Sequence, residues 1–518
     1  MTDAALPRRP DSVGQSLGTA VSGSDPIIRS GSPRDRSRSR ADALLSLPLI
    51  PIACGLTLLA AALVNPLDVE FRNSGEVDSV GLDWQVALKL VVSAIAGIVG
   101  LLGFVTSERV RHALSTLPGA GLVALGCVVL ATSAVALDEV ANVCRAAAII
   151  YCIFVLFIPT AIAVLKLRTI VLMILAGLTM HMVVSWILYI FVPSIGVFEE
   201  ELAGSTFVPR MSGTAHPNSV GRVGVLSIVI CLALLRAYKL PELSSRGKWI
   251  VRGLVLLGII TAIQTMSRTA MAAGVASAIV MQWDRLLTRT GALIGLIAVP
   301  VVLAGFLVIG LSSHSDRIDD VVVSMGTKTG DATELTSATG RTVIWEVAIG
   351  LIQERPWTGW GLNSAPILLS EFSQHTHNLV LHVFFSGGII AGGIAIILVL
   401  WTGIVGLLSR EPLVRGVCAY VLVSGCFEDT VMETFPFSST LLWFIALLAP
   451  VMYSDALMGE SSSADDPGPT NECEPRSTSD SIQESGSMGS RDHGVSVHQP
   501  ESTATGSIPI RASVPGWN

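Results

Sequence analysis

The stretch that decides the fold class is residues 144–192, which read CRAAAIIYCIFVLFIPTAIAVLKLRTIVLMILAGLTMHMVVSWILYIFV. It consists of two apolar runs, near 144–165 and 168–192, separated by Lys166 and Arg168. About 20 apolar residues in helical form cross the roughly 30 Å hydrocarbon core of a bilayer. Each run is long enough to do so, and the pair predicts two membrane-spanning helices joined by a positively charged loop.

Runs of the same kind recur along the chain, so its composition as a whole is that of a membrane protein. Of the 518 residues, 51% are hydrophobic and 14% are charged, whereas soluble globular chains carry about 25% charged residues. We therefore predict an all-α polytopic membrane protein with about 12 transmembrane helices. The expected spans lie near residues 43–65, 84–106, 117–137, 144–165, 168–192, 218–236, 249–265, 269–282, 290–312, 377–408, 414–428 and 437–453.

The two ends of the chain differ from this apolar middle. Residues 1–42 are rich in Arg, Ser, Pro and Gly without an apolar core, which predicts a disordered basic tail and not a signal peptide. Residues 455–518 are rich in Ser, Glu and Asp and are expected to form a disordered acidic tail. From Ser454 onward there are ten acidic and three basic residues, which accounts for the whole net charge of −7. The membrane domain, 43–454, is balanced in charge, and no nucleic-acid partner is expected.

Basic residues mark one side of the predicted membrane domain. When the loops are sorted by the alternation of the spans, six basic groups fall on one face, and the positive-inside bias makes that face cytoplasmic. Both termini are then cytoplasmic. The groups are Arg34 to Arg40, Arg109 with Arg111, Lys166 with Arg168, the cluster Arg236, Lys239, Arg246 and Lys248, Arg285 with Arg289, and Arg410 with Arg415.

The opposite, extracytoplasmic face carries one long loop, about 313–375. Loops longer than about 12–15 residues in compact proteins are usually functional or disordered. The second half of this loop predicts a helix, because apolar residues recur at helical spacing from Arg341 to Ile352 and Pro356 ends the pattern. We therefore expect a helix of the loop at the membrane surface.

Three arginines on the extracytoplasmic side run against the charge bias. Arg210 precedes the sixth span, Arg268 lies in a tight turn between two apolar runs, and Arg341 opens the loop helix. A guanidinium beside the free N–H groups of a helix start favours an anion between them. Any one of these arginines alone could instead reach lipid headgroups or pair with a carboxylate. Three of them on one side favour an anionic ligand.

Histidines accompany these arginines. His375 and His377 close the long loop, and Asn378 follows at the start of the tenth span. An imidazole titrates near neutral pH and can act as a base at the membrane surface, although one of these residues could simply cap the helix. Two histidines separated by one residue, with no third ligand nearby, make a poor metal site, so neither a metal nor a cofactor is expected. His216 and Asn218 begin the sixth span as further candidates, with Asn218 alternatively a helix cap.

The last outer loop supplies carboxylates on the same side as the arginines. Glu428, Asp429 and Glu433 lie in this loop. We expect them to pair with the arginines, an expectation that rests on sidedness alone.

Five motifs between about residues 205 and 405 resemble those of a known family. They are Arg210-x-x-Gly213 with His216-Pro217-Asn218, Ser267-Arg268-Thr269, Gly340-Arg341-x-x-x-Trp345, Pro356-Trp357-x-Gly359-Trp360-Gly361, and His375-x-His377-Asn378. The set is similar to that of the O-antigen ligase and O-antigen polymerase superfamily of bacterial membrane glycosyltransferases. That family's pattern of His, Asn, nine residues and Gly-x-x-Gly is met at His377, Asn378 and Gly388, with Ala391 in place of the last glycine.

The resemblance implies a metal-independent glycosyltransferase of the bacterial inner (plasma) membrane, with its active site on the extracytoplasmic face. The implied donor is an oligosaccharide linked to a polyprenyl diphosphate, and the implied acceptor is a glycan or lipid-glycan hydroxyl in surface polysaccharide assembly. By the family's pattern His377 is the catalytic residue, and Arg210 and Arg268 bind the diphosphate. Whether the chain is a ligase or a polymerase depends on the acceptor and stays open. The remaining candidates for substrate binding are Arg341, His216, Asn218, His375 and Asn378.

A membrane transporter of an anionic solute is the alternative function, since outward arginines could line an anion entrance. Transporters usually need ionisable groups in the middle of the membrane. Such groups are scarce here: Lys89 and His181 are the clearest, and His382 lies one turn into its span. This scarcity favours the enzyme.

Overall fold

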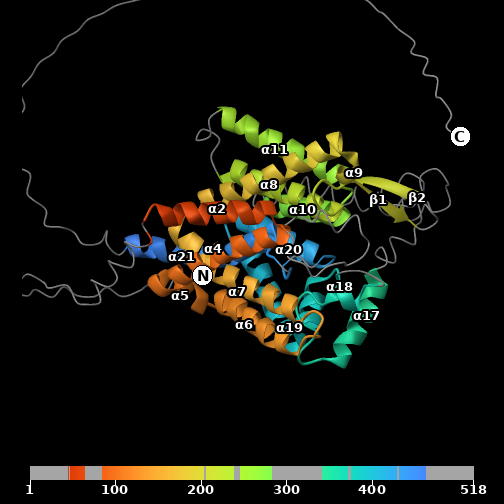
Figure 1. The fold of residues 1–518 in the computed structure, drawn as a ribbon. Coiled ribbons are helices and arrows are strands. Elements are labelled where there is room, and N and C mark those ends of the chain that lie inside the picture. The colour runs from red at the N-terminus through yellow and green to blue at the C-terminus, as the bar shows by residue number, and fades with distance from the viewer. Residues whose placement is uncertain are drawn as a thin grey trace, which may run out of the picture. The chain divides into compact units, whose positions relative to one another are not determined.

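The computed structural model describes residues 45, 47–64, 84–202, 206–237, 245–282, 341–370, 375–428, 431–433 and 435–461. Within these ranges the chain is mostly helical (Figure 1). The larger apolar helices are α2 (Leu49–Val64), α4 (Trp84–Thr106), α6 (Leu117–Thr132), α7 (Ala141–Val164), α8 (Leu167–Phe191), α10 (Pro217–Ala237), α11 (Ser245–Gln264), α12 (Arg268–Met281), α19 (Leu379–Leu408), α20 (Pro412–Gly425) and α21 (Ser438–Ser461). Between them lie α5 (Glu108–Ser115), the short 3₁₀ helix η1 (Ser133–Val135), α9 (Pro193–Gly196), α17 (Arg341–Glu354) and α18 (Ala365–Leu368).

The helices agree with a polytopic membrane protein. Among the described residues, 7 helices are long and apolar enough to cross a membrane, and shorter apolar helices accompany them. Each expected span except the one near 290–312 coincides with a described helix. That ninth span lies outside the described residues, so the expected total of about 12 stays a prediction. The tail 1–42, the first part of the loop 313–375 and most of the tail 455–518 also lie outside them, although α21 continues past 454 to Ser461.

One segment departs from the expectation of an all-α chain. Strands β1 (Val197–Leu202) and β2 (Thr206–Met211) form a two-stranded antiparallel sheet in which Val197 lies opposite Met211. The backbone N–H groups of Ser212 and Gly213 both donate to the carbonyl of Gly196, at 2.9 and 3.0 Å, and close the base of the hairpin. A two-stranded hairpin depends on its surroundings for stability. Each strand has only six residues, so a search for long apolar runs interprets the segment as a loop.

Hydrogen bonds join helix ends that the charge pattern assigns to the cytoplasmic face. Arg236, at the end of α10, donates to Oε1 of Gln282, just after α12, at 2.7 Å. The hydroxyl of Tyr453 in α21 donates to the carbonyl of Leu165, between α7 and α8, at 3.4 Å. The grouping of these ends agrees with the predicted alternation of spans, while the orientation across the membrane stays a prediction.

The helix predicted from Arg341 onward is confirmed as α17, which packs beside α19 (Figure 1), while the extracytoplasmic loop around it stays a prediction. Ile344 and Ala348 are buried on its apolar face. They share a hydrophobic cluster with Trp360 and Phe385, which lie after α17 and in α19. Burial of this face against α19 is what holds α17 in place.

A break in α19 receives the segment that follows α17. Gly388 has φ 67° and ψ −165° inside the helix, and the N–H of Ile389 donates to the carbonyl of Pro356 at 2.8 Å. A Cβ at Gly388 would lie 2.3 Å from the carbonyl carbon of Trp357, so only glycine fits this close approach. The break therefore fixes the position of α17 relative to α19, whose first turn adjoins His377.

Candidate active site

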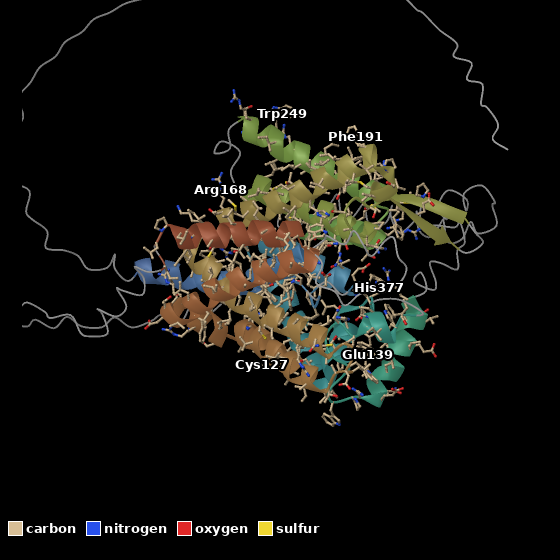
Figure 2. All side chains as sticks on the ribbon, viewed as in Figure 1. Cys127, Glu139, Arg168, Phe191, Trp249 and His377 are labelled. Atoms are coloured by element: carbon tan, nitrogen blue, oxygen red, sulfur yellow. The ribbon has the colours of Figure 1, made fainter. Side chains whose placement is uncertain are left out.

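His377 lies just before α19, where that helix meets α17. In Figure 2, Arg168 and Phe191 label the two ends of α8, and His377 lies toward the Phe191 end of the view. In this view His377 therefore lies away from the Arg168 end of α8.

The backbone at His377 is strained and held on both sides. Its φ of 50° lies in the left-handed region, which costs a residue with a side chain about 1–3 kcal/mol. The indole N–H of Trp345 donates to the carbonyl of Thr376 at 2.9 Å. Asn378 is the N-cap of α19, and its Nδ2 donates to the carbonyl of Cys426 at 3.1 Å. Asn378 thus caps the helix, and its expected contact with substrate stays a prediction.

The side chain of His377 meets a carboxylate that also binds an arginine. Nδ1 of His377 lies 3.2 Å from Oε2 of Glu428, and the Arg341 guanidinium donates to Oε1 of Glu428 at 3.0 Å. The side chains of His377, Arg341 and Glu428 are 21%, 16% and 9% exposed. We call these three residues the histidine cluster. The expected pairing of Glu428 with an outer arginine is confirmed, and Glu428 itself is the anion that Arg341 meets.

Glu428 is held in its ionised form. Burial alone would raise the pKa of its carboxyl group, but the hydrogen bond and charge of His377 and the nearby guanidinium groups of Arg222 and Arg341 oppose it. The net effect lowers the pKa below its usual value. At neutral pH Glu428 is therefore a carboxylate that only accepts hydrogen bonds.

Arg222 and Glu433 form a second ion pair near the histidine cluster. The two side chains meet at 2.6 Å, and the Arg222 guanidinium lies 4.3 Å from the ring centre of Phe437. Sequence reasoning did not select Arg222, although a charged residue inside a predicted span is itself a signal of function. Arg222 therefore adds to Lys89, His181 and His382, the ionisable residues that the sequence analysis names inside the predicted spans.

Arg210 lies on β2 and is almost fully buried, at 2% exposure. Its Nε and one terminal nitrogen donate to the carbonyl of Thr265 at 2.9 and 2.7 Å. The same terminal nitrogen donates to Oδ1 of Asn218 at 2.8 Å. We call Arg210, Asn218 and Thr265 the arginine clamp, because they tie β2 to the start of α10 and the end of α11.

The arginine clamp supports the turn that presents Arg268. Thr265 is three residues before Arg268, which is the first residue of α12 and is half-buried. Between them Met266 has φ 50°, a second strained position beside a candidate residue. The clamp therefore places the Arg268 side chain at the N-terminal end of α12, where helix N–H groups favour anions.

The remaining candidates have structural contacts. Nδ1 of His216 accepts from the N–H of Asn218 at 3.3 Å. The side chain that caps this N–H group is therefore that of His216, whereas the sequence suggested Asn218 as the capping residue. The ring of His216 also packs edge-on against Phe198, with 5.3 Å between ring centres. The ring of His375 lies 6.2 Å from that of His377, again edge-on. Roles of these residues with substrate stay predictions.

The first turns of α10 connect the two groups. Asn218 and Arg222 are four residues apart and so lie on one face of the helix. Asn218 belongs to the arginine clamp, and the charge of Arg222 acts on Glu428 in the histidine cluster. Among the described residues, no group of three or more His, Cys, Asp or Glu side chains could hold a metal ion. The expected metal independence stays a prediction.

The central part of the chain matches the model of a known protein family. Residues 253–397 match the family model described as O-antigen ligase. The matched segment contains Arg268, Arg341 and the turn 375–378, and it ends before Glu428.

A curated relative adds to this match. The general O-oligosaccharyltransferase of Acinetobacter baylyi is 27% identical over 232 residues, which cover 42% of this chain. The match spans 39% of the relative's own length. Taken with the motifs and the apolar helices, these matches support the resemblance of the chain to the O-antigen ligase superfamily.

Proposed function

We propose that this protein transfers a glycan from a polyprenyl-diphosphate-linked donor to an acceptor hydroxyl, at the extracytoplasmic face of the bacterial inner membrane. The observation that carries the proposal is His377. Its backbone is strained, its ring is partly exposed, and its Nδ1 meets a buried carboxylate. Constrained, partly exposed imidazoles of this kind serve as general bases. The family match and the relative's name, which specifies transfer of an oligosaccharide to oxygen, support glycan transfer.

The proposed step is a substitution at the anomeric carbon of the donor sugar. The acceptor oxygen forms a bond to that carbon as its proton passes to His377. The bond from carbon to the diphosphate oxygen breaks, and its electron pair leaves with the polyprenyl diphosphate. Guanidinium groups offset the negative charge that develops on the leaving group. We propose that arginines, in place of a metal ion, do this.

The arginines take different parts in this proposal. Arg268 contacts the diphosphate, because its side chain is more accessible than that of Arg210 and it lies at the start of α12. Arg210 supports it by gripping the turn before α12 and by adding a buried positive charge. Arg341 acts on the other side of the site, through Glu428. The residues proposed to line the substrate site further are His216, Asn218, His375 and Asn378.

The experiment is transfer by the purified full chain in detergent, supplied with a labelled polyprenyl-diphosphate oligosaccharide and an acceptor. Product is measured by gel and mass spectrometry, together with the released polyprenyl diphosphate. His377→Ala should lower the rate by about 10²–10⁴-fold, the usual contribution of a general base. The matched control is His112→Ala, which changes an exposed histidine of α5 and should transfer at the wild-type rate.

Each outcome decides one part of the proposal. Wild-type rates in His377→Ala would overturn the role of His377, and loss of activity with a chelator would overturn the metal-free mechanism. Donor consumption in detergent needs no membrane gradient, so it separates the enzyme from a transporter of an anionic solute. Acceptors carrying a repeat unit, a lipid core or a protein hydroxyl, compared in turn, distinguish polymerase from ligase.

A further inference from the structure

We infer that Glu428 is a positioning residue that fixes the tautomer and the orientation of His377, and that Arg341 holds the Glu428 carboxylate for this purpose. The inference rests on the proposed function, because it assigns roles around the proposed base. It also gives Arg341 a part that differs from direct binding of the donor.

The two oxygens of Glu428 are divided between two partners. Oε1 accepts from Arg341 at 3.0 Å and Oε2 faces Nδ1 of His377 at 3.2 Å. A carboxylate has no hydrogen to donate, so the ring hydrogen of His377 lies on Nδ1. The lone pair is then on Nε2, and this tautomer can take the acceptor's proton at that nitrogen. Without the carboxylate both tautomers are available, and only one of them is productive.

Helix α17 holds the base from two directions. Arg341 and Trp345 are four residues apart and share a face of this helix. The indole of Trp345 binds the backbone carbonyl of Thr376, the residue before His377. Arg341 binds the Glu428 carboxylate, which faces the imidazole ring of His377. The two contacts fix the backbone and the side-chain partner of His377 from one rigid element. A base supported in this way keeps its geometry between turnovers.

Other charged groups surround the carboxylate. Arg222 of α10 acts on Glu428 together with Arg341 and His377. Glu433 pairs with Arg222 at 2.6 Å and so offsets that cation. The Arg341 guanidinium also lies 5.8 Å from the ring centre of Phe427, the residue before Glu428. The carboxylate of Glu428 thus accepts hydrogen bonds from Arg341 and His377, and the positive charges of Arg222 and Arg341 both act on it.

The test is Glu428→Gln in the full chain, assayed for transfer with donor and acceptor varied. The amide keeps the shape but loses the charge, and it can donate as well as accept. We expect kcat to fall about 10–100-fold with the donor KM within twofold, because positioning a base acts on the chemical step. Glu428→Asp keeps the charge and should restore part of kcat.

The matched control is Glu346→Gln, which changes an exposed carboxylate on α17 and should leave kcat and the donor KM unchanged. Wild-type kcat in Glu428→Gln would overturn the inference and leave the proposed function standing. Absence of transfer by the wild-type protein would instead overturn the proposed function. If Glu428→Gln does not accumulate in membranes, Glu428→Asp decides. A reduced kcat at unchanged donor KM supports the inference, and full activity overturns it.

Discussion

The arginine clamp and the histidine cluster use the same side chain in opposite settings. Arg210 is bound by a backbone carbonyl and an amide oxygen, which carry no formal charge. Arg341 is bound by the carboxylate of Glu428. These bonds of Arg210 add no negative charge to the arginine clamp, whereas the bond of Arg341 brings a carboxylate to the histidine cluster. The partner of an arginine, more than its side of the membrane, thus decides what it can do for a substrate.

Burial strengthens the contrast. Arg210 is 2% exposed, whereas the Arg341 side chain is 16% exposed. Burying a charge costs several kcal/mol unless its surroundings compensate. The hydrogen bonds from Arg210 to Thr265 and Asn218 are part of that compensation. Changing the charge at each group of residues tests how the two arginines differ.

The largest effect is expected from Arg210→Met, which removes the buried cation. It leaves the acceptors at Thr265 and Asn218 without this donor, and an unsatisfied buried acceptor costs about 1–3 kcal/mol. Transfer should fall by at least about 10²-fold, as it does when a donor to developing charge is removed. Donor titrations in the transfer assay and the amount of monodisperse protein after extraction measure the two effects.

Arg210→Lys is the matched variant, because it keeps the charge and loses the planar fork of donors. It should accumulate normally in membranes and transfer about tenfold more slowly. If Arg210→Met transferred as well as Arg210→Lys, the positive charge of the arginine clamp would have no part in the reaction.

The sequence predicts those features that depend on local pattern. Apolar length is a property of one segment, so it predicts the apolar helices, and helical spacing from Arg341 onward predicts α17. The motif around His377 falls on a turn whose backbone is strained. What could not be predicted are the partners. The contact of His377 with Glu428 joins residues 51 positions apart, and that of Arg222 with Glu433 joins residues 211 apart. Such pairs depend on tertiary packing.

An intermediate effect is expected from Asn218→Asp, which makes the arginine clamp resemble the histidine cluster. A carboxylate in place of the amide would put a negative charge next to Arg210, now 2.8 Å from Oδ1 of Asn218. The donor KM should rise about tenfold, or about 1.4 kcal/mol, because less positive charge remains for the diphosphate. The acceptor KM should stay within about twofold, and both are measured by steady-state transfer.

Asn218→Ala is its control, since it removes the hydrogen bond without adding charge. Its donor KM should stay within about threefold of wild type, because the Thr265 carbonyl still holds Arg210. Equal donor KM values for Asn218→Asp and Asn218→Ala would mean that the charge of Arg210 is not used on the donor, and the contrast between the two regions would fail.

The smallest effect concerns the acid stability of the histidine cluster. The folded pKa of Glu428 is lowered from its usual value of 4.5, so the folded protein binds this proton less tightly than the unfolded chain does. The stability that Glu428 contributes is therefore complete above about pH 4.5 and is lost as the pH falls through the folded pKa. Other carboxylates titrate in the same range, so the informative quantity is the difference between wild type and Glu428→Gln. Thermal unfolding in detergent measures it.

The melting temperature of wild type minus that of Glu428→Gln should decrease between pH 6 and pH 3, by about 1 °C for each kcal/mol of stability lost from a chain of this length. The sign of this change does not depend on which protein is more stable at pH 6, because only wild type carries the titrating group. A difference that stays constant, or grows on acidification, would mean that Arg341 and His377 do not hold Glu428 ionised. The histidine cluster would then differ from the arginine clamp in geometry alone and not in charge.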